Sequence, residues 1–249
     1  MYYNVVSSGS KGNATIVVHN KTVILIDMGI SLSRLEEGLA EINLSLKDID
    51  GAIFTHNHAD HISGIKFLSP KIMYALEGTL PGGLTNIVDL YKAFEVGEIK
   101  ITPVKTSHDA INPCGYVLEA GEEKLVYMTD TGIFLDETLP YVKNPNYIIF
   151  ESNHDIKMLL NTKRTYELKC RIMSEVGHLC NEDSAIAITS IIGDKTKDII
   201  LAHLSEEANT PELALAAYMK VFRHFGFNVD NYNLKCANQW KSLIGGNTL

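Results

Sequence analysis

The sequence predicts an α/β fold in which two β-sheets are flanked by helices. Short runs with strand character alternate with helical patterns in two successive halves of the 249 residues, and no Pro- or Ser-rich linker separates the halves. In addition, His and Asp residues recur at the ends of the apolar strand runs. We therefore expect one large domain over residues 1–249, with its chemistry at the strand ends.

The composition is that of a folded globular protein with a sizeable core, because 45% of the residues are hydrophobic and 21% are charged. The chain starts without a basic, apolar leader, and no stretch reaches about 18 uninterrupted apolar residues, so we expect a cytoplasmic protein with no membrane partner. The four cysteines are far apart and form no CxxC pair. This spacing argues against a disulfide framework and against a thiolate zinc site.

The net charge of −8 has the wrong sign for a surface that coats DNA through many Lys and Arg contacts. This charge does not exclude a nuclease, because bound divalent cations and a local basic cluster can supply positive potential where phosphates bind. The sequence contains one modest basic cluster of this kind, formed by Lys163, Arg164, Lys169 and Arg171. Such a cluster is more often a solvated helix face than a nucleic-acid surface, so it gives a nuclease only weak support.

In chain order, the first half contains predicted strands over residues 4–7, 15–18, 23–27 and 52–55. A Gly/Ser loop over residues 8–13 and a turn over residues 19–21 separate the first three of them. Apolar residues at helical spacing predict helices over residues 32–42 and 61–68. The residues before position 61 therefore lie where a strand leads into a helix.

In the second half, strands are predicted over residues 99–104, 115–119, 124–129, 147–150 and 198–204, with a tight turn at residues 120–123. Helices are predicted within residues 154–173, over 181–192 with Asn181 as N-cap, and over 211–225. Thr210 as N-cap, Pro211 at the first helical position and Gly226 after the end define the last helix.

Three imidazoles and one carboxylate lie within six positions directly after the strand over residues 52–55: His56, His58, Asp60 and His61. Imidazole nitrogen and carboxylate oxygen suit Zn²⁺, Mn²⁺ or Fe²⁺. In an extended loop, side chains two positions apart point the same way, so His56 and His58 can share one ion. Asp60 and His61 then face another ion, and the spacing favours a pair of ions.

Further ligands stand at the ends of later strand runs, namely His108, Asp130 and His203. Each alone would be unremarkable in a strand-end turn, but their order after the motif makes them candidate ligands. An aspartate that ends an apolar strand is well suited to bridge two ions.

The order of these residues resembles the metallo-β-lactamase superfamily, and most closely its YycJ/WalJ group of bacterial metallohydrolases. The resemblance covers nearly the full chain, through residues 8–13, 107–110, 129–132, 150–155, 176–183 and 201–205. It implies an αββα sandwich of two mixed sheets flanked by helices. It also implies 5′-to-3′ exonuclease action on DNA. The group is similar to RNase Z and other nucleic-acid phosphodiesterases of the superfamily.

By position, the resemblance assigns His56, His58, His108 and Asp130 to the first ion, and Asp60, His61, Asp130 and His203 to the second. Zn²⁺ or Mn²⁺ is expected, with Fe²⁺ as a further candidate. Ala59 stands where the family commonly has Ser, and Asn57 stands where an acidic residue is common. Neither position supplies a ligand, so these departures concern metal preference.

The expected reaction is hydrolysis of a phosphodiester by a hydroxide that bridges the two ions. Asp60 would orient this hydroxide, and His178 or His154 would protonate the leaving oxygen. His178 also lies three residues before a predicted helix start, where free N–H groups favour an anion such as phosphate. The loop over residues 8–13 is a second candidate phosphate contact.

Two other functions are compatible with the sequence. One is a metallohydrolase of the same fold that acts on a small ester, thioester or lactam, or on RNA. The other is a metal-binding regulator without catalysis, against which the complete ligand set argues, since structural zinc sites are usually richer in Cys. Residues 151–155 and 176–183 resemble the nuclease-like branch, and they favour nucleic acid as the substrate.

Overall fold

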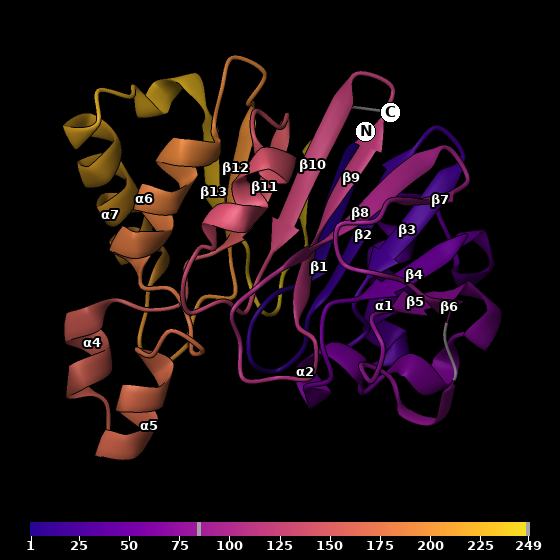
Figure 1. The fold of residues 1–249 in the computed structure, drawn as a ribbon, viewed down its shortest axis with the longest axis horizontal. Helices are drawn as coiled ribbons and strands as arrows, with labels where there is room; N and C mark the ends of the chain where they lie inside the picture. Colours follow the sequence, from indigo (N-terminus) through magenta and orange to yellow (C-terminus); the bar gives the residue numbers. More distant parts are fainter. Residues whose placement is uncertain (84–85, 248–249) are drawn as a thin grey trace. The chain divides into compact units, whose positions relative to one another are not determined.

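The computed structural model describes residues 1–83 and 86–247, whose contacts group into two compact units. Unit 1 comprises Met1–Lys105, Ala110–Glu123 and Ala237–Leu249, and unit 2 comprises Thr106–Asp109 and Lys124–Cys236. Figure 1 shows the elements of each unit in sequence colours. The expectation of a single domain over residues 1–249 stays a prediction.

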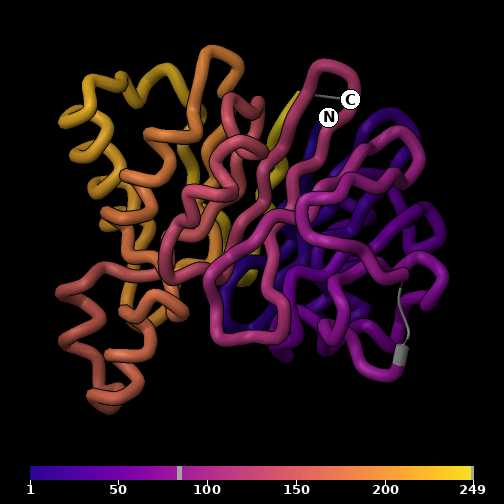
Figure 2. The backbone as a smooth tube through the Cα atoms, in the orientation of Figure 1, coloured from indigo at the N-terminus to yellow at the C-terminus, as the bar shows by residue number. Residues whose placement is uncertain are grey.

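Unit 1 contains a seven-stranded sheet with the order β14-β1-β2-β3-β4-β5-β6. Its strands are β1 (Tyr2–Ser7), β2 (Ala14–His19), β3 (Thr22–Ile26), β4 (Gly51–Phe54), β5 (Met73–Ala75), β6 (Asn86–Ile87) and β14 (Leu243–Gly246). The pairs from β14 to β3 are antiparallel and the pairs from β3 to β6 are parallel. The first and last strands, β1 and β14, thus pair within unit 1. Figure 2 traces the backbone in the orientation of Figure 1.

The predicted helix over residues 32–42 is confirmed as α1 (Leu32–Ala40). The Ser31 side chain caps it by accepting a hydrogen bond from the Arg34 amide, a common N-terminal signal. Leu35 and Leu39 are buried and belong to the core that α1 shares with β2, β3 and β4. The amphipathic pattern of the sequence therefore placed this helix correctly.

The predicted helix over residues 61–68 is wrong, because the structure has only α2 (Ala59–Ile62) and a separate 3₁₀ turn over Ile65–Phe67. Gly64 breaks the helix: its N–H donates to Met28 O (2.8 Å) rather than to a carbonyl one turn earlier. A Cβ at this position would lie 2.7 Å from Met28 Cγ. The glycine allows a close tertiary contact that apolar spacing cannot reveal. Other 3₁₀ turns of unit 1 cover Leu46–Asp48, Pro70–Ile72 and Pro81–Gly83.

Unit 1 also contains three antiparallel strands, β7 (Phe94–Val96), β8 (Ile99–Lys105) and β9 (Cys114–Ala120). The last two confirm the strands predicted over residues 99–104 and 115–119. Gly121 follows β9 with φ of 57°, in the left-handed region that a tight hairpin turn requires.

Unit 2 is built on four parallel strands, β10 (Glu123–Met128), β11 (Tyr147–Glu151), β12 (Asp198–Ala202) and β13 (Asn233–Cys236). The register pairs Met128 with Phe150 and Phe150 with Leu201. The carboxyl ends of β10, β11 and β12 are therefore aligned, which brings the residues that follow them to one edge. Both sheets of the chain are mixed, so the predicted α/β fold class is confirmed.

The helices of unit 2 are α3 (Leu139–Val142), α4 (Ile156–Asn161), α5 (Tyr166–Ile172), α6 (Asn181–Ile191) and α7 (Pro211–His224), with 3₁₀ turns over Asp136–Thr138 and Val229–Asn231. The predicted start of α7 is confirmed, since Thr210 Oγ1 accepts from the Leu213 amide and Pro211 opens the helix. No helix in the described ranges is long and apolar enough to cross a membrane.

The predicted N-cap of α6 is wrong, because Cys180 rather than Asn181 caps the helix, with the Asp183 amide 3.4 Å from its Sγ. The Asn181 side chain is buried and bonds instead to Ser152 Oγ (2.7 Å) and Asn209 Oδ1 (2.9 Å). Its amide is used for tertiary packing, which its residue type alone does not disclose.

Candidate metal centre

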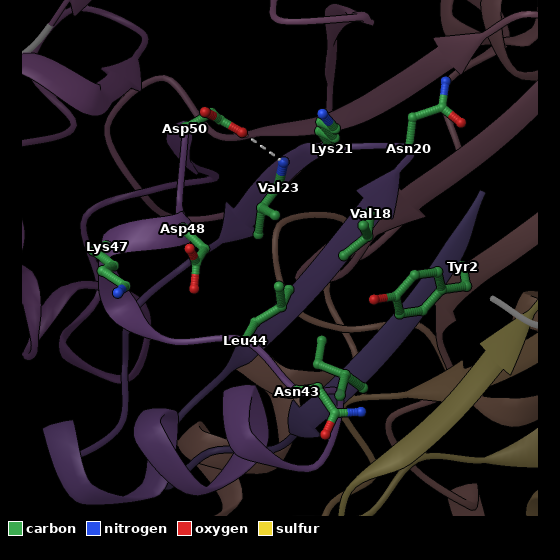
Figure 3. A pocket seen from close by; sticks show the side chains of 11 residues that line it. Tyr2, Val18, Asn20, Lys21, Val23, Asn43, Leu44, Lys47, Asp48 and Asp50 are labelled. Carbon is green, nitrogen blue, oxygen red and sulfur yellow. Dashed lines mark hydrogen bonds between the residues drawn. The ribbon is translucent and has the colours of Figure 1, made fainter.

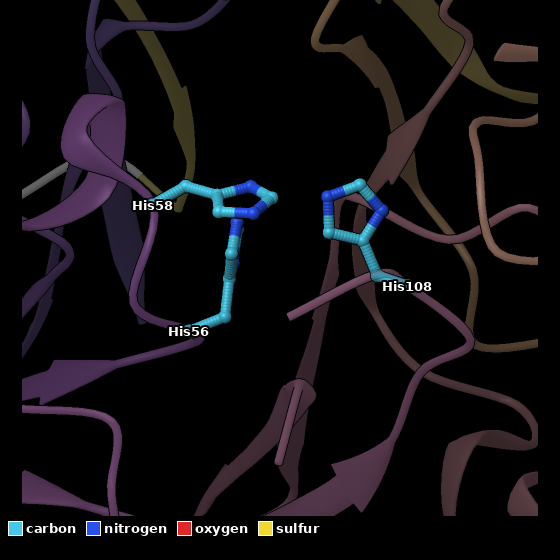
Figure 4. A group of neighbouring side chains, drawn as sticks. All are labelled: His56, His58 and His108. Atoms are coloured by element: carbon cyan, nitrogen blue, oxygen red, sulfur yellow. The ribbon is translucent and has the colours of Figure 1, made fainter. Parts of the chain in front are cut away.

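The ligand motif of unit 1 begins at the end of β4, and the structure brings its four side chains together. The His56 ring lies 4.6 Å from the His58 ring and 4.0 Å from the His61 ring, between centroids. Nitrogen and oxygen ligand atoms of His61 and Asp60 lie within 4.8 Å of one another. Figure 4 shows the rings of His56 and His58, and it also draws His108, which belongs to unit 2.

Backbone contacts from two other loops of unit 1 hold this motif in place. The Asn13 amide donates to Asp60 O (2.8 Å), and the Met28 amide donates to His61 O (2.8 Å). Gly29 approaches so closely that a Cβ on it would lie 1.6 Å from Asp60 O. Only glycine permits this approach, so the loop after β3 fixes the start of α2.

Asp27, directly after β3, orients His61. Its carboxylate is fully buried, with Oδ2 2.8 Å from His61 Nδ1, and Oδ1 accepts from the Thr55 amide (2.9 Å). An acceptor on Nδ1 leaves Nε2 as the lone-pair nitrogen and fixes the ring, as carboxylates do for metal-binding histidines. Asp27 also has φ of 59°, a conformation that costs energy outside glycine.

Sequence reasoning missed Asp27 as a functional residue. The available signal was that it ends the apolar strand over residues 23–27, just as Asp130 ends the strand over residues 124–129. Its partner His61 lies 34 positions away, so nothing local connects the two.

The loop over residues 8–13 uses its amides within the protein. Gly9 N–H donates to Asn13 Oδ1 (2.9 Å), and Lys11 N–H donates to Gln239 Oε1 (3.0 Å). Gly12 N–H donates to Gly9 O (3.0 Å). The structure therefore gives no support to a phosphate cradle made of these amides. The Asn13 amide nitrogen instead lies 3.0 Å from His61 Nε2 and 3.4 Å from Asp60 Oδ2, so the loop buttresses the motif.

The cluster of unit 2 lies at the carboxyl ends of β10, β11 and β12. Four side chains each offer one ligand atom, and these atoms all lie within 4.8 Å of one another: Asp130, Glu151, His178 and His203. His108 also approaches the cluster, with Nε2 3.8 Å from Asp130 Oδ1. The aligned parallel strands bring Asp130 and His203 together, while His108 joins them from the loop after β8 and His178 from the loop before α6.

Asp130 and His203 both have a left-handed backbone, with φ of 58° and 55° respectively. Such a conformation costs on the order of 1 kcal/mol or more for a residue with a Cβ, and it is concentrated at functional sites. Asp130 Oδ1 lies 3.5 Å from His203 Nδ1. The strained turns aim both side chains at the same edge of the sheet.

Glu151 ends β11 and accepts hydrogen bonds on both oxygens while fully buried. Its Oε1 lies 2.9 Å from Nδ1 of both His178 and His203, and Oε2 accepts from the amides of Thr131 (2.9 Å) and Leu179 (3.1 Å). Burial raises the pKa of Glu151, but the charge of His178 and the hydrogen bonds from the two histidines outweigh it and hold the pKa at about 2. Glu151 therefore acts as an anionic acceptor that orients two imidazoles.

Sequence reasoning did not identify Glu151 as a site residue, although it used residues 151–155 as a mark of the substrate class. The overlooked signal in the sequence was an acidic residue at the end of an apolar strand. In the structure, this strand end is aligned with the ends of two strands that lead into candidate ligands.

His154 differs from the other histidines of unit 2. It is buried, and its Nδ1 has no hydrogen-bond partner within the described part of the chain. Burial is the largest cause that lowers the pKa of His154 to about 4. The imidazole is therefore neutral near pH 7. Burial likewise lowers the pKa of His108, whose Nδ1 lies 3.0 Å from Gly177 O.

The donor set fits divalent transition-metal ions. In four of the predicted histidine ligands, Nδ1 contacts an oxygen of the protein. Nδ1 of His56 lies 3.0 Å from Thr55 Oγ1, and Nδ1 of His61 contacts Asp27. Nδ1 of His108 contacts Gly177 O, and Nδ1 of His203 contacts Glu151. Four predicted ligands thus share an arrangement in which the distal Nε2 is presented to a cation. Imidazole and carboxylate donors suit Zn²⁺, Mn²⁺ and Fe²⁺.

A separate pocket of about 590 Å³ lies in unit 1, against β1 to β3 and the segment after α1. Figure 3 shows Tyr2, Val18 and Lys21 around it, with Asp50 bonded to the Val23 amide. None of the candidate ligands lines this pocket, so it is distinct from the metal centre.

Comparison with known proteins matches residues 22–203 to the family described as the Beta-lactamase superfamily domain. The chain is 36% identical over 242 residues to "Exodeoxyribonuclease YycJ" of Bacillus anthracis, covering 92% of each chain. It is also 36% identical over 227 residues to "Exodeoxyribonuclease WalJ" of Streptococcus pneumoniae serotype 2, covering 85% of this chain and 84% of the relative.

Solved structures confirm the fold. The metallo-β-lactamase fold protein YhfI from Bacillus subtilis superposes with a TM-score of 0.72 at 16% identity, over 98% of this chain and 99% of that chain. The short form of human tRNase Z superposes with a TM-score of 0.65 at 13% identity, over 98% of each chain. The family match, the relatives and these folds agree: the chain belongs to the metallo-β-lactamase superfamily and is a hydrolase.

Proposed function

We propose that this protein is a metal-dependent phosphodiesterase, an exonuclease that degrades DNA in the 5′-to-3′ direction. The observation that carries the proposal is the 36% identity, over 92% of both chains, to a protein named exodeoxyribonuclease. The buried, carboxylate-oriented histidines of each unit supply the donors that such a metal-dependent hydrolase needs.

The proposed site holds two divalent ions, Zn²⁺ or Mn²⁺ with Fe²⁺ as a further candidate. The first would be bound by His56, His58, His108 and Asp130, and the second by Asp60, His61, Asp130 and His203. Glu151 is assigned an orienting role, because its oxygens already accept four hydrogen bonds. When bound, the ions would lower the pKa of a water molecule and neutralise charge on the phosphate.

Asp60 is proposed to orient the attacking water through its carboxylate. Asn13 Nδ2 lies 3.4 Å and His61 Nε2 3.5 Å from Asp60 Oδ2, which restrains that oxygen. The side chain is 24% exposed, so water and substrate can reach it.

His178 is proposed to protonate the leaving oxygen. Its Nδ1 lies 2.9 Å from Oε1 of buried Glu151, which orients the ring. His154, the second candidate acid, is held neutral by its lowered pKa of about 4, so it has no proton to donate as an imidazolium near pH 7. The structure thus favours His178 of the two.

Replacing Asp60 by Ala should lower DNA hydrolysis by about 100-fold or more, the scale of a positioned acid–base or orienting group. The measurement is a panel of 5′-labelled and 3′-labelled single- and double-stranded DNA and RNA, incubated with Mn²⁺ or Zn²⁺. Release of mononucleotides from the 5′ end of DNA is expected for the unmodified protein. If a small ester or lactam is hydrolysed while no nucleic acid is cut with any metal, the nuclease proposal fails.

Replacing His178 by Ala should reduce turnover roughly 100-fold with little change in bound metal, because a general acid acts on the leaving group. Replacing His154 by Ala should have a much smaller effect. Turnover on DNA and metal content by atomic emission are measured for both variants. The general-acid assignment is wrong if turnover of the His178 variant is unchanged, or if a leaving group that needs no proton fails to restore its rate.

A further inference from the structure

Helices α4 and α5, with the segments between and after them, form an arm over residues 156–176 in which most residues are exposed. Figure 1 shows the two helices as a pair set off from α6 and α7 of the same unit. Asp155 and Thr165 cap them by accepting from the amides of Met158 and Leu168. One small apolar cluster of Leu159, Ile172 and Ala208 packs the arm onto unit 2. Most of the arm's side chains are therefore free to face solvent.

The arm carries the opposite charge to the rest of the chain. It contains five basic residues and two acidic ones, so its net charge is +3, whereas the whole chain has −8 and the remainder therefore −11. The basic residues are Lys157, Lys163, Arg164, Lys169 and Arg171. A locally positive surface on an acidic protein attracts a polyanion to this place in particular.

Some of these cations stabilise the arm, while two remain available to a ligand. Arg164 pairs with Glu207 (3.0 Å), and Arg171 pairs with Asp109. Lys169 Nζ donates to two carbonyl oxygens of the arm. Lys157 and Lys163 are exposed and have no acidic partner within the described residues.

An exposed aromatic residue lies between these basic residues in the sequence. Tyr166 opens α5 and is 77% exposed, and apolar side chains on α4 are also exposed, including Leu160 at 52% and Ile156 at 42%. A ring presented to solvent beside Lys and Arg is the arrangement on which proteins stack unpaired nucleobases. Because a base must leave its duplex to stack on such a ring, the arrangement suits a single strand.

The arm is joined directly to the candidate site of unit 2. His154 precedes its first helix, and His178 follows it, with the His178 amide donating to Ile172 O (2.9 Å). Arg171 bonds to Asp109, the neighbour of His108. Since α5 has seven residues, Tyr166 stands about 10 Å along the helix from its site-proximal end. A strand must therefore span more than one nucleotide to contact both.

We infer that the α4–α5 arm binds single-stranded nucleic acid, with Tyr166 stacking on a base and Lys157 and Lys163 contacting phosphates. The inference rests on the proposed nuclease function and adds a length-dependent binding surface to it. Substrates long enough to reach the arm bind tightly, and short substrates bind through the site alone. The positive charge favours this occupant over an apolar protein partner.

Replacing Tyr166 by Ala tests the stacking contact. For a labelled single strand of about 20 nucleotides, the Kd from fluorescence anisotropy and the KM should rise about 5- to 100-fold, with kcat nearly unchanged. For a dinucleotide, both parameters should stay the same. Tyr166→Phe should restore binding, because the ring is retained. Phe225→Ala, at a 51% exposed aromatic after α7, is the matched control and should have no effect.

The double variant Lys157→Glu/Lys163→Glu should also weaken binding of the long strand and lower the salt dependence of its Kd. Lys220→Glu/Lys235→Glu changes the charge of unit 2 equally at exposed positions outside the arm, and should leave the Kd within about twofold. Circular dichroism of each variant separates a binding defect from unfolding.

Equal effects of Tyr166→Ala on the long and short substrates would overturn the inference, as would no effect on either. Dissociation of a dimer by Tyr166→Ala, with DNA binding unchanged, would assign the arm to a second copy of the chain and overturn it too. None of these results would contradict cleavage of DNA by the unmodified protein, so the proposed function would still stand. If the unmodified protein neither binds nor cuts any nucleic acid, the proposed function itself fails.

Discussion

Replacing Glu151 by Ala is expected to lower the affinity for divalent ions about 10- to 100-fold and to destabilise the protein by about 3 kcal/mol or more. The carboxylate is fully buried and accepts from two imidazoles and from the amides of Thr131 and Leu179. Its loss leaves these donors without an acceptor and allows His178 and His203 to rotate. Metal affinity is measured by competition with a chromogenic chelator, and stability by denaturant unfolding of the metal-free protein.

Glu151→Gln removes the negative charge of the side chain but keeps its size and shape. The amide keeps one oxygen for the imidazoles but turns an N–H group toward the amides of Thr131 and Leu179, so it should recover only part of the lost stability. Glu167→Ala, at an exposed acidic residue of α5, provides the control and should change stability by less than about 0.5 kcal/mol. A metal affinity equal to that of the unmodified protein in both Glu151 variants would refute the orienting role.

Removal of divalent ions with a chelator is expected to abolish hydrolysis and to lower the unfolding temperature. Asp130 and Glu151 are both buried, and their ligand atoms lie within 4.8 Å of one another, so their like charges repel when no cation is bound. An ion present at 100 times its Kd stabilises the folded state by about 2.7 kcal/mol. Activity and unfolding temperature are measured before chelation, after it, and after addition of Mn²⁺ or Zn²⁺.

Addition of one of these ions should restore both properties, whereas Mg²⁺ should restore them poorly, because imidazole donors suit Mn²⁺ and Zn²⁺ better. Elemental analysis confirms that the chelated sample is free of metal. Full activity in such a sample would contradict metal-dependent hydrolysis.

Several elements of the fold could be predicted because their signals are local. Strands β8 to β12 and helix α1 have the apolar spacing of their class, and Thr210 with Pro211 marks the start of α7. The strands β5, β6, β7, β13 and β14 were missed. These strands have two to four residues and are partly exposed, so they are defined by pairing with a neighbour rather than by their own composition.

By itself, the sequence determined the types of donor and their order along the chain, because HxHxDH is contiguous and the later His and Asp residues end recognisable strands. Tertiary structure alone decided what orients these donors. Asp27 meets His61 across 34 positions, and Glu151 meets His203 across 52. It also decided that Gly64 interrupts a helix and that the α4–α5 arm exposes Tyr166. The physical reason is that hydrogen-bond partners and burial depend on which distant strands and loops pack together, and the periodicity of a single segment carries no information about that.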